Sequence, residues 1–164
     1  MGRRERLSVS GRALRLLAFV TFYGYIALLV VAGAWGAFGW AALDQRWLYD
    51  LDVGGLAPST SASLLSQYRF LRAIELGYGT LAWRYRREIF TDGRFGRPFL
   101  GIMTAGVLAR VVGLVADGRP KTVFFFFMIS ELIGVVAIFT FARERWSGAA
   151  RDEISARRRP FPTP

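Results

Sequence analysis

Long apolar stretches separated by short polar segments dominate the pattern along the chain. The first runs from about residue 16 to 43 and the fourth from about 122 to 142. Both reach the roughly 20 residues that a helix needs to cross a bilayer core. A second stretch, 62–83, accepts several charges, and a third, 99–116, is short for a span. The pattern predicts an all-α protein built as a bundle of four transmembrane helices.

The connecting segments orient this bundle. The N-terminal segment MGRRERLSVSGRALR, the segment 84–98 and the tail from residue 143 are rich in arginine, whereas 44–63 holds one arginine, Arg46. Arginine-rich segments tend to stay in the cytoplasm. We therefore expect both termini inside the cell, with a basic N-terminus (1–15), a four-helix transmembrane domain (16–142) and a basic C-terminal tail (143–164). The first apolar stretch exceeds the roughly 7–15 apolar residues of a signal peptide and is interpreted as an uncleaved anchor.

Local signals refine the predicted boundaries. Pro98 suits the start of the third helix, and GRFGRP before it is interpreted as a solvated basic loop. The end of the tail, RRRPFPTP, is not expected to fold alone. Aromatic residues near the predicted helix ends are typical of a membrane-interface belt; they are Trp35, Trp40, Trp47, Tyr49, Trp83, Tyr85 and Trp146.

Composition supports a membrane location and excludes several chemistries. The chain is 53% hydrophobic and carries a net charge of +10. A soluble helical bundle with four such apolar stretches would have too little polar surface to cover them. It has no cysteine and no histidine, so disulfides, thiolate or imidazole metal sites and a Ser–His–Asp triad are excluded. We expect no metal, no cofactor and no catalytic residues. Because topology explains the arginines, nucleic acid is not an expected partner.

Five charged residues interrupt the apolar spans: Arg69, Arg72, Glu75, Arg110 and Glu131. With both termini inside, Arg72 and Arg110 fall in the outer half of the bilayer, and Glu75 and Glu131 near its middle. A lone charge at the bilayer centre costs about 2.5–3.5 kcal/mol. The four groups are therefore predicted to meet as an intramembrane ion network in which each carboxylate has a guanidinium partner. Arg69 is then a surplus charge, from whose side any anionic ligand is expected to enter.

This network has two interpretations. The leading one is structural: ion pairs that hold three helices in register. The other is a polar pathway or a binding site for an anion, a proton or a lipid headgroup. The spacing of small residues also indicates close helix packing; these residues are Gly33, Gly36, Gly39, Ala73, Gly77, Ala109 and Gly113.

Three short motifs resemble one known family. YRFLRAIELGYG in the second span, ARVVGLVADGRP leading into the third loop and ELIG in the fourth span are similar to the DUF4345 family. These are small bacterial four-helix membrane proteins of unknown function, so the resemblance implies an architecture and no activity.

Two functional hypotheses follow. The first is a non-catalytic accessory subunit of a larger bacterial inner-membrane complex, with a respiratory or photosynthetic energy-converting complex as one host. Its partners would be membrane lipids and larger integral membrane proteins, with Arg157, Arg158 and Arg159 contacting an acidic surface or lipid headgroups. The second is a small transporter or a lipid- or anion-binding protein that uses the intramembrane arginines and glutamates. An enzyme ranks third, because no constellation of residues argues for one.

Overall fold

The computed structural model describes residues 3–157, with side chains described for residues 11–143 and 145–147. Its elements are α1 (Arg3–Phe38), α2 (Ala41–Tyr49), a 3₁₀ turn η1 (Val53–Gly55), α3 (Pro58–Arg84), α4 (Arg86–Thr91), α5 (Gly93–Ala116) and α6 (Thr122–Arg157). No strand occurs within residues 3–157, which confirms the predicted all-α class.

Three helices in the described part of the chain are long and apolar enough to cross a membrane. They are Gly11–Phe38 of α1, Gly93–Ala116, which is α5, and Thr122–Ser147 of α6. These helices indicate a membrane protein. The other long helix, α3, is not among them, because Arg69, Arg72 and Glu75 lie near its centre.

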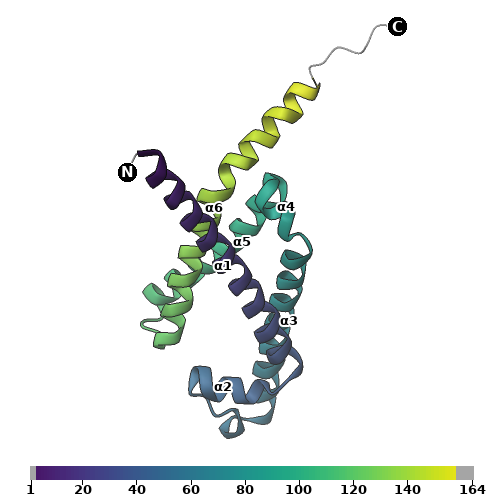
Figure 1. The fold of residues 1–164 in the computed structure, drawn as a ribbon. Helices are drawn as coiled ribbons and strands as arrows, with labels where there is room; N and C mark the ends of the chain where they lie inside the picture. The colour runs from purple at the N-terminus through teal and green to yellow at the C-terminus, as the bar shows by residue number, and fades with distance from the viewer. Residues whose placement is uncertain (1–2, 158–164) are drawn as a thin grey trace, which may run out of the picture.

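The long helices are arranged around α1 (Figure 1). Helix α1 packs along α3 and crosses α6, while α5 packs on α6. The contacts between α1 and α3 run antiparallel, from the Tyr23 and Trp83 rings at one end to Ala37 and Arg69 at the other. Helix α2 lies at one end of the bundle and α4 toward the other, where the ends of α1 and α6 extend beyond it (Figure 1). The short helices therefore cover opposite ends of the bundle.

Aromatic side chains fill the core at the α4 end. Phe90 of α4 lies 4.7 Å from the Phe19 ring and 4.8 Å from the Phe22 ring, measured between centroids. Phe22 also meets Phe99 of α5, and Phe90 meets Phe141 of α6. Aromatic pairs of this kind add about 0.5–1.5 kcal/mol each beyond the burial of their area. Four helices are joined by this cluster, so it fixes how α5 and α6 sit on α1.

Helix α5 begins earlier than predicted, which corrects the interpretation of GRFGRP as a loop. Asp92 caps the helix: its carboxylate accepts a hydrogen bond of 2.8 Å from the Arg94 backbone N–H. Hydrogen bonds from the Arg94 side chain and backbone lower the pKa of Asp92 below its usual value. The helix therefore starts at Gly93, and Pro98 lies inside it, where it removes one backbone hydrogen bond.

Trp146 also differs from its predicted place in an interface belt. The structure buries it, and its indole N–H donates to the Ile89 carbonyl at 3.2 Å. Gly96 makes room for the ring, because a Cβ there would clash with it and would lie 2.5 Å from the Ile89 oxygen. Trp146 thus joins α6 to α4 and α5. Trp146 is buried because of this tertiary contact, which its position near a predicted helix end could not predict.

The two outer helices extend beyond the predicted spans. Helix α1 starts at Arg3, within the segment predicted as a basic N-terminus, and ends at Phe38 instead of near residue 43. Helix α6 continues to Arg157, through much of the predicted tail. Of the predicted headgroup-contact residues, Arg157 has only its main chain described, and Arg158 and Arg159 lie outside the described residues.

Candidate functional site

A cavity of about 500 Å³ lies among α1, α3, α5 and α6, with α2 beside it. It exists because α3 and α5 touch at one end and do not pack along each other further on. At the touching end, the Tyr78 hydroxyl donates to the Phe99 carbonyl at 2.9 Å, and the two rings stack. We call this space the inner cavity. Its polar lining residues are Tyr25, Tyr49, Tyr68, Arg72, Glu75, Tyr78, Arg110 and Glu131.

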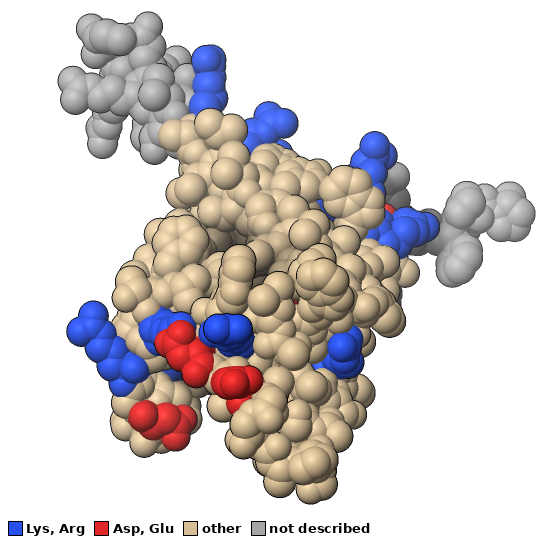
Figure 2. Space-filling view, turned by 90° about the horizontal axis from the view of Figure 1, so that it is seen from below, with Lys and Arg blue, Asp and Glu red and all other residues tan. Residues whose placement is uncertain are grey.

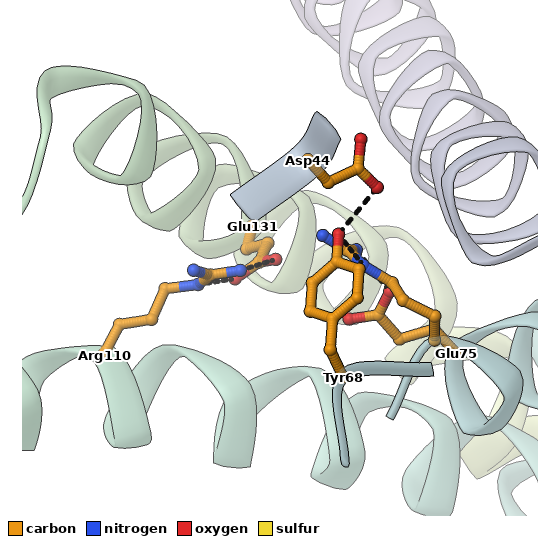
Figure 3. Close-up of polar contacts among 6 residues, drawn as sticks. Asp44, Tyr68, Glu75, Arg110 and Glu131 are labelled. Atoms are coloured by element: carbon orange, nitrogen blue, oxygen red, sulfur yellow. Dashed lines mark hydrogen bonds and ion pairs between the residues drawn. The ribbon is translucent and has the colours of Figure 1, made fainter. Parts of the chain in front are cut away.

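The first of two ion pairs in the inner cavity joins α5 to α6 (Figure 3). The Arg110 guanidinium contacts both Glu131 carboxylate oxygens, Nε to Oε2 at 3.1 Å and Nη2 to Oε1 at 3.2 Å. The Glu131 side chain is 12% exposed and that of Arg110 35% exposed. A two-point contact of this kind fixes direction as well as distance. Arg110 and Glu131 therefore set the register of α5 on α6.

The second ion pair lies within α3. The Arg72 Nη1 is 2.6 Å from the Glu75 Oε2, and the Arg72 Nε donates to the Tyr68 hydroxyl at 2.9 Å. Tyr68 in turn donates to the Asp44 carboxylate at 2.9 Å, and the Trp35 indole donates to the other Asp44 oxygen. Figure 3 shows this chain of contacts reaching from α2 to the cavity. It links the end of the molecule to the charges at its centre.

The two pairs stay separate, which corrects the expectation of one network across three helices. Among the side chains that the structure describes, no ion pair joins Arg72 or Glu75 to Arg110 or Glu131. The reason is local: residues three apart on a helix share a face, so Arg72 and Glu75 satisfy each other within one turn. Of these two pairs, the one between Arg110 and Glu131 joins two helices.

Arg69 has a different role from the surplus charge that was predicted. Its guanidinium donates to the Ala37 and Gly39 carbonyls, both at 2.9 Å. These are carbonyls at and just after the C-terminal end of α1, which lack partners within the helix and carry the negative end of its dipole. Arg69 thus caps α1 from α3. This contact explains why α1 ends near Phe38 although the apolar stretch continues.

Small residues bring α1 and α3 into close contact at three positions. A Cβ added to Gly33 would lie 2.7 Å from the Leu76 backbone nitrogen, and one added to Gly36 would lie 2.5 Å from the Arg72 side chain. Gly79, which the spacing argument did not include, faces Leu29 in the same way at 2.9 Å. The close approach of these two helices therefore depends on glycine.

The other predicted packing residues are placed elsewhere. Gly39 lies after α1, where an added Cβ would meet the Trp35 carbonyl at 2.5 Å. Ala73 and Ala109 are exposed, and Gly77 has no atom within 4 Å of an added Cβ. Gly113 faces only Asp117, from its own helix end. Ala73 and Ala109 are therefore not buried between helices, and no other described helix lies against Gly77 or Gly113.

Sequence reasoning missed the hydroxyl groups of the site. Tyr25, Tyr68 and Tyr78 line the inner cavity, and Asp44 orients Tyr68. Tyr68 lies four residues before Arg72, on the same face of α3. That spacing is a signal that could have been used, but nothing local connects Tyr25 or Asp44 to the charges.

The lining suits a ligand with a polar, uncharged or dipolar group. Two guanidiniums and two carboxylates cancel, and the tyrosine hydroxyls add neutral donors and acceptors. Apolar residues supply much of the remaining wall, among them Leu28, Leu71, Ile74, Ile102 and Phe127. Figure 2 shows charged side chains of both signs beside a hollow in the surface at the α2 end.

Comparison with known proteins identifies the family. No curated protein and no solved structure matches the chain significantly. The profile of one family, described as a domain of unknown function (DUF4345), matches residues 16–142, which contain all four long-helix cores and both ion pairs. Because this match covers well over half of the sequence, the chain belongs to the DUF4345 family.

Proposed function

We propose that this protein is a non-catalytic membrane protein that binds a small amphiphilic molecule in the inner cavity. One observation carries the proposal: two ion pairs, from α3 and from α5 with α6, line a single cavity whose other walls are largely apolar. A purely structural pair needs no cavity beside it. A ligand with a dipolar or neutral polar group could exchange hydrogen bonds with the pairs while its apolar part contacts the leucine and phenylalanine side chains.

The proposal includes four membrane spans, with both termini in the cytoplasm. Helix α3 packs antiparallel along α1, so it shares the depth of a helix that is itself apolar enough to span. Its charges are offset by Glu75, Tyr68 and the end of α1. The segment that contains α4 carries Arg84, Arg86, Arg87, Arg94 and Arg97, which favours the cytoplasmic side for that end.

Single cysteines test this topology directly, because the natural chain has none. Ser59→Cys, at the start of α3, is expected to react with a membrane-impermeant maleimide in intact cells or spheroplasts. Thr91→Cys, at the end of α4, is expected to react only after the membrane is permeabilised. Both positions are exposed. Labelling of both from outside would mean that α3 does not cross, and the reverse pattern would invert the topology.

A matched pair of glycines on α5 tests ligand binding. Gly106 lines the inner cavity, while Gly101 does not, and neither has an atom within 4 Å of an added Cβ. Gly106→Phe is expected to fill the cavity without straining the helix, and Gly101→Phe to leave it open. Native mass spectrometry of protein taken gently from its own membrane should show a bound small molecule on the natural protein and on Gly101→Phe. The same molecule should be reduced about tenfold or more on Gly106→Phe, as expected for loss of roughly 1.4 kcal/mol or more.

The proposal fails if Gly106→Phe and Gly101→Phe carry the same bound molecules in the same amounts. Comparable unfolding transitions for the two variants are the control for folding. Because both substitutions replace glycine by phenylalanine on one helix, differences in helix propensity cancel.

A second proposal is an accessory subunit of a larger membrane complex. The observation that favours it is the outer face of α3, where Ala73 and Gly77 lie four residues apart, exposed and without a helix against them in the described residues. Small residues at this spacing allow another helix to approach closely. A stoichiometric complex on a native gel that Gly77→Leu disperses would support this proposal, and a lone small particle would count against it.

A further inference from the structure

We propose that a second pocket, between α2 and the turn that joins α5 to α6, binds an anionic group such as a phosphate. The pocket has a volume of about 490 Å³ and shares four lining residues with the inner cavity, Leu48, Tyr49, Arg110 and Phe124. We call it the turn pocket. Three cationic side chains line it: Arg110, Arg119 and Lys121.

Arg119 is the residue on which the proposal chiefly rests. Among the side chains that the structure describes, no carboxylate lies within ion-pair distance of it, and its guanidinium carbon lies 5.7 Å from the centre of the Phe125 ring. A guanidinium has five donors in a fixed plane, which matches the oxygens of a phosphate or a carboxylate. Stacking on Phe125 leaves its donors available to a ligand.

Lys121 and Arg110 each have a carboxylate partner but keep N–H donors that this partner does not use. Lys121 contacts Asp50 at 2.6 Å and donates to the Trp47 carbonyl at 3.2 Å, which leaves one of its three N–H groups. The Asp50 side chain is 76% exposed, so this pair is screened by water and salt. Arg110 uses its Nε and Nη2 on Glu131, and its guanidinium retains further N–H groups. Both side chains can therefore contribute to an anion held by Arg119.

Among the residues that line the turn pocket, one is acidic and opposes binding. Asp117 lines the turn pocket, and its carboxylate lies beside Gly113. Its charge is expected to weaken the site, which supplies a test with the opposite sign. Apolar groups complete the pocket, including Phe124 and Met128. A lining of charged and apolar side chains at the end of two membrane-length helices fits the headgroup depth of a bilayer, where phosphates lie.

Arg110 connects the two spaces, because it lines both the turn pocket and the inner cavity. An anion in the turn pocket would compete with Glu131 for this guanidinium. Binding at the surface would then loosen the α5–α6 pair at the centre. This coupling goes beyond binding in the inner cavity and does not depend on it.

Lipid competition measured by native mass spectrometry tests the site. The purified protein is mixed with phosphatidylglycerol and phosphatidylcholine that carry the same acyl chains. Charge-assisted hydrogen bonds predict roughly a tenfold contribution of the turn pocket to the preference for phosphatidylglycerol, which equals about 1.4 kcal/mol. Arg119→Gln should lose most of that contribution, and Asp117→Asn should increase it. Arg87→Gln, an exposed arginine of α4 at the other end of the molecule, is the matched control.

Equal losses in Arg119→Gln and Arg87→Gln would overturn the proposal, since they would show only a general attraction of arginine for anionic lipid. No change in Arg119→Gln would overturn it as well. Inorganic phosphate separates the sources of the anion: competition with phosphatidylglycerol supports recognition of the free anion, and retained preference supports a lipid phosphate. Gly106→Phe is expected to leave the preference unchanged, so failure of the inner-cavity proposal would be seen separately.

Discussion

Replacing Arg110 by alanine is expected to destabilise the folded protein by about 3–5 kcal/mol. The substitution leaves Glu131, which is 12% exposed, without its guanidinium partner. An unpaired charge at this depth must either recruit water or take up a proton, and both cost free energy. The measurement is the free energy of unfolding in mixed micelles, followed by tryptophan fluorescence.

Two further variants show that the loss comes from the orphaned charge. Arg110→Met together with Glu131→Met removes both charges and keeps similar volumes, so its stability should lie within about 1–2 kcal/mol of the natural protein. Arg94→Ala breaks a pair whose arginine is 79% exposed, and it should change stability by less than about 1 kcal/mol. If the double variant were as unstable as Arg110→Ala, lost packing and not charge would be the cause.

The sequence predicts the class of the fold and the approximate helix cores because hydrophobic runs act locally. It does not predict the ends. Helix α1 ends near Phe38, where Arg69 of α3 donates hydrogen bonds to the carbonyls at the helix end. Helix α5 begins at Gly93, where the Asp92 side chain caps it. Both helix ends depend on a tertiary contact or a capping side chain, and neither is visible in the pattern of apolar residues. Burial of Trp146 depends likewise on a glycine fifty residues away in the chain, Gly96.

For the candidate site, the sequence indicated the charged residues more readily than the shape around them. Arg72 and Glu75 share a helical face by their separation alone. The sequence also predicted a guanidinium partner for each carboxylate, but it did not assign Arg110 to Glu131. The cavity beside them arises because α3 and α5 diverge beyond Tyr78 and Phe99. That divergence is a property of the packed helices, so the hydroxyl groups and the open space could not be derived from local patterns.

Substitution of one glycine in α1 and one in α3 by alanine is expected to change the free energy of unfolding in opposite directions. Gly33→Ala is expected to destabilise the protein by about 1–3 kcal/mol, because the new Cβ would lie 2.7 Å from a backbone nitrogen of α3 that cannot move aside. The helices would have to separate, which would also weaken the contact between Gly36 and the Arg72 stem. Gly77→Ala should instead stabilise by up to about 1 kcal/mol, because the space is open and alanine favours a helix.

The comparison is decisive because both changes add one methyl group to a membrane-associated helix. If the two variants unfolded at the same denaturant concentration, the close approach of α1 and α3 at Gly33 would be wrong. A loss at Gly33 alone would place α3 against α1 over its charged half. Arg72 and Glu75 would then lie at the same depth as the apolar centre of α1, where an ion pair is stable only if protein shields it from lipid. The same placement of α3 against α1 accounts for the inner cavity. The helices that shield the two ion pairs from lipid, α1, α5 and α6, also enclose the space beside them.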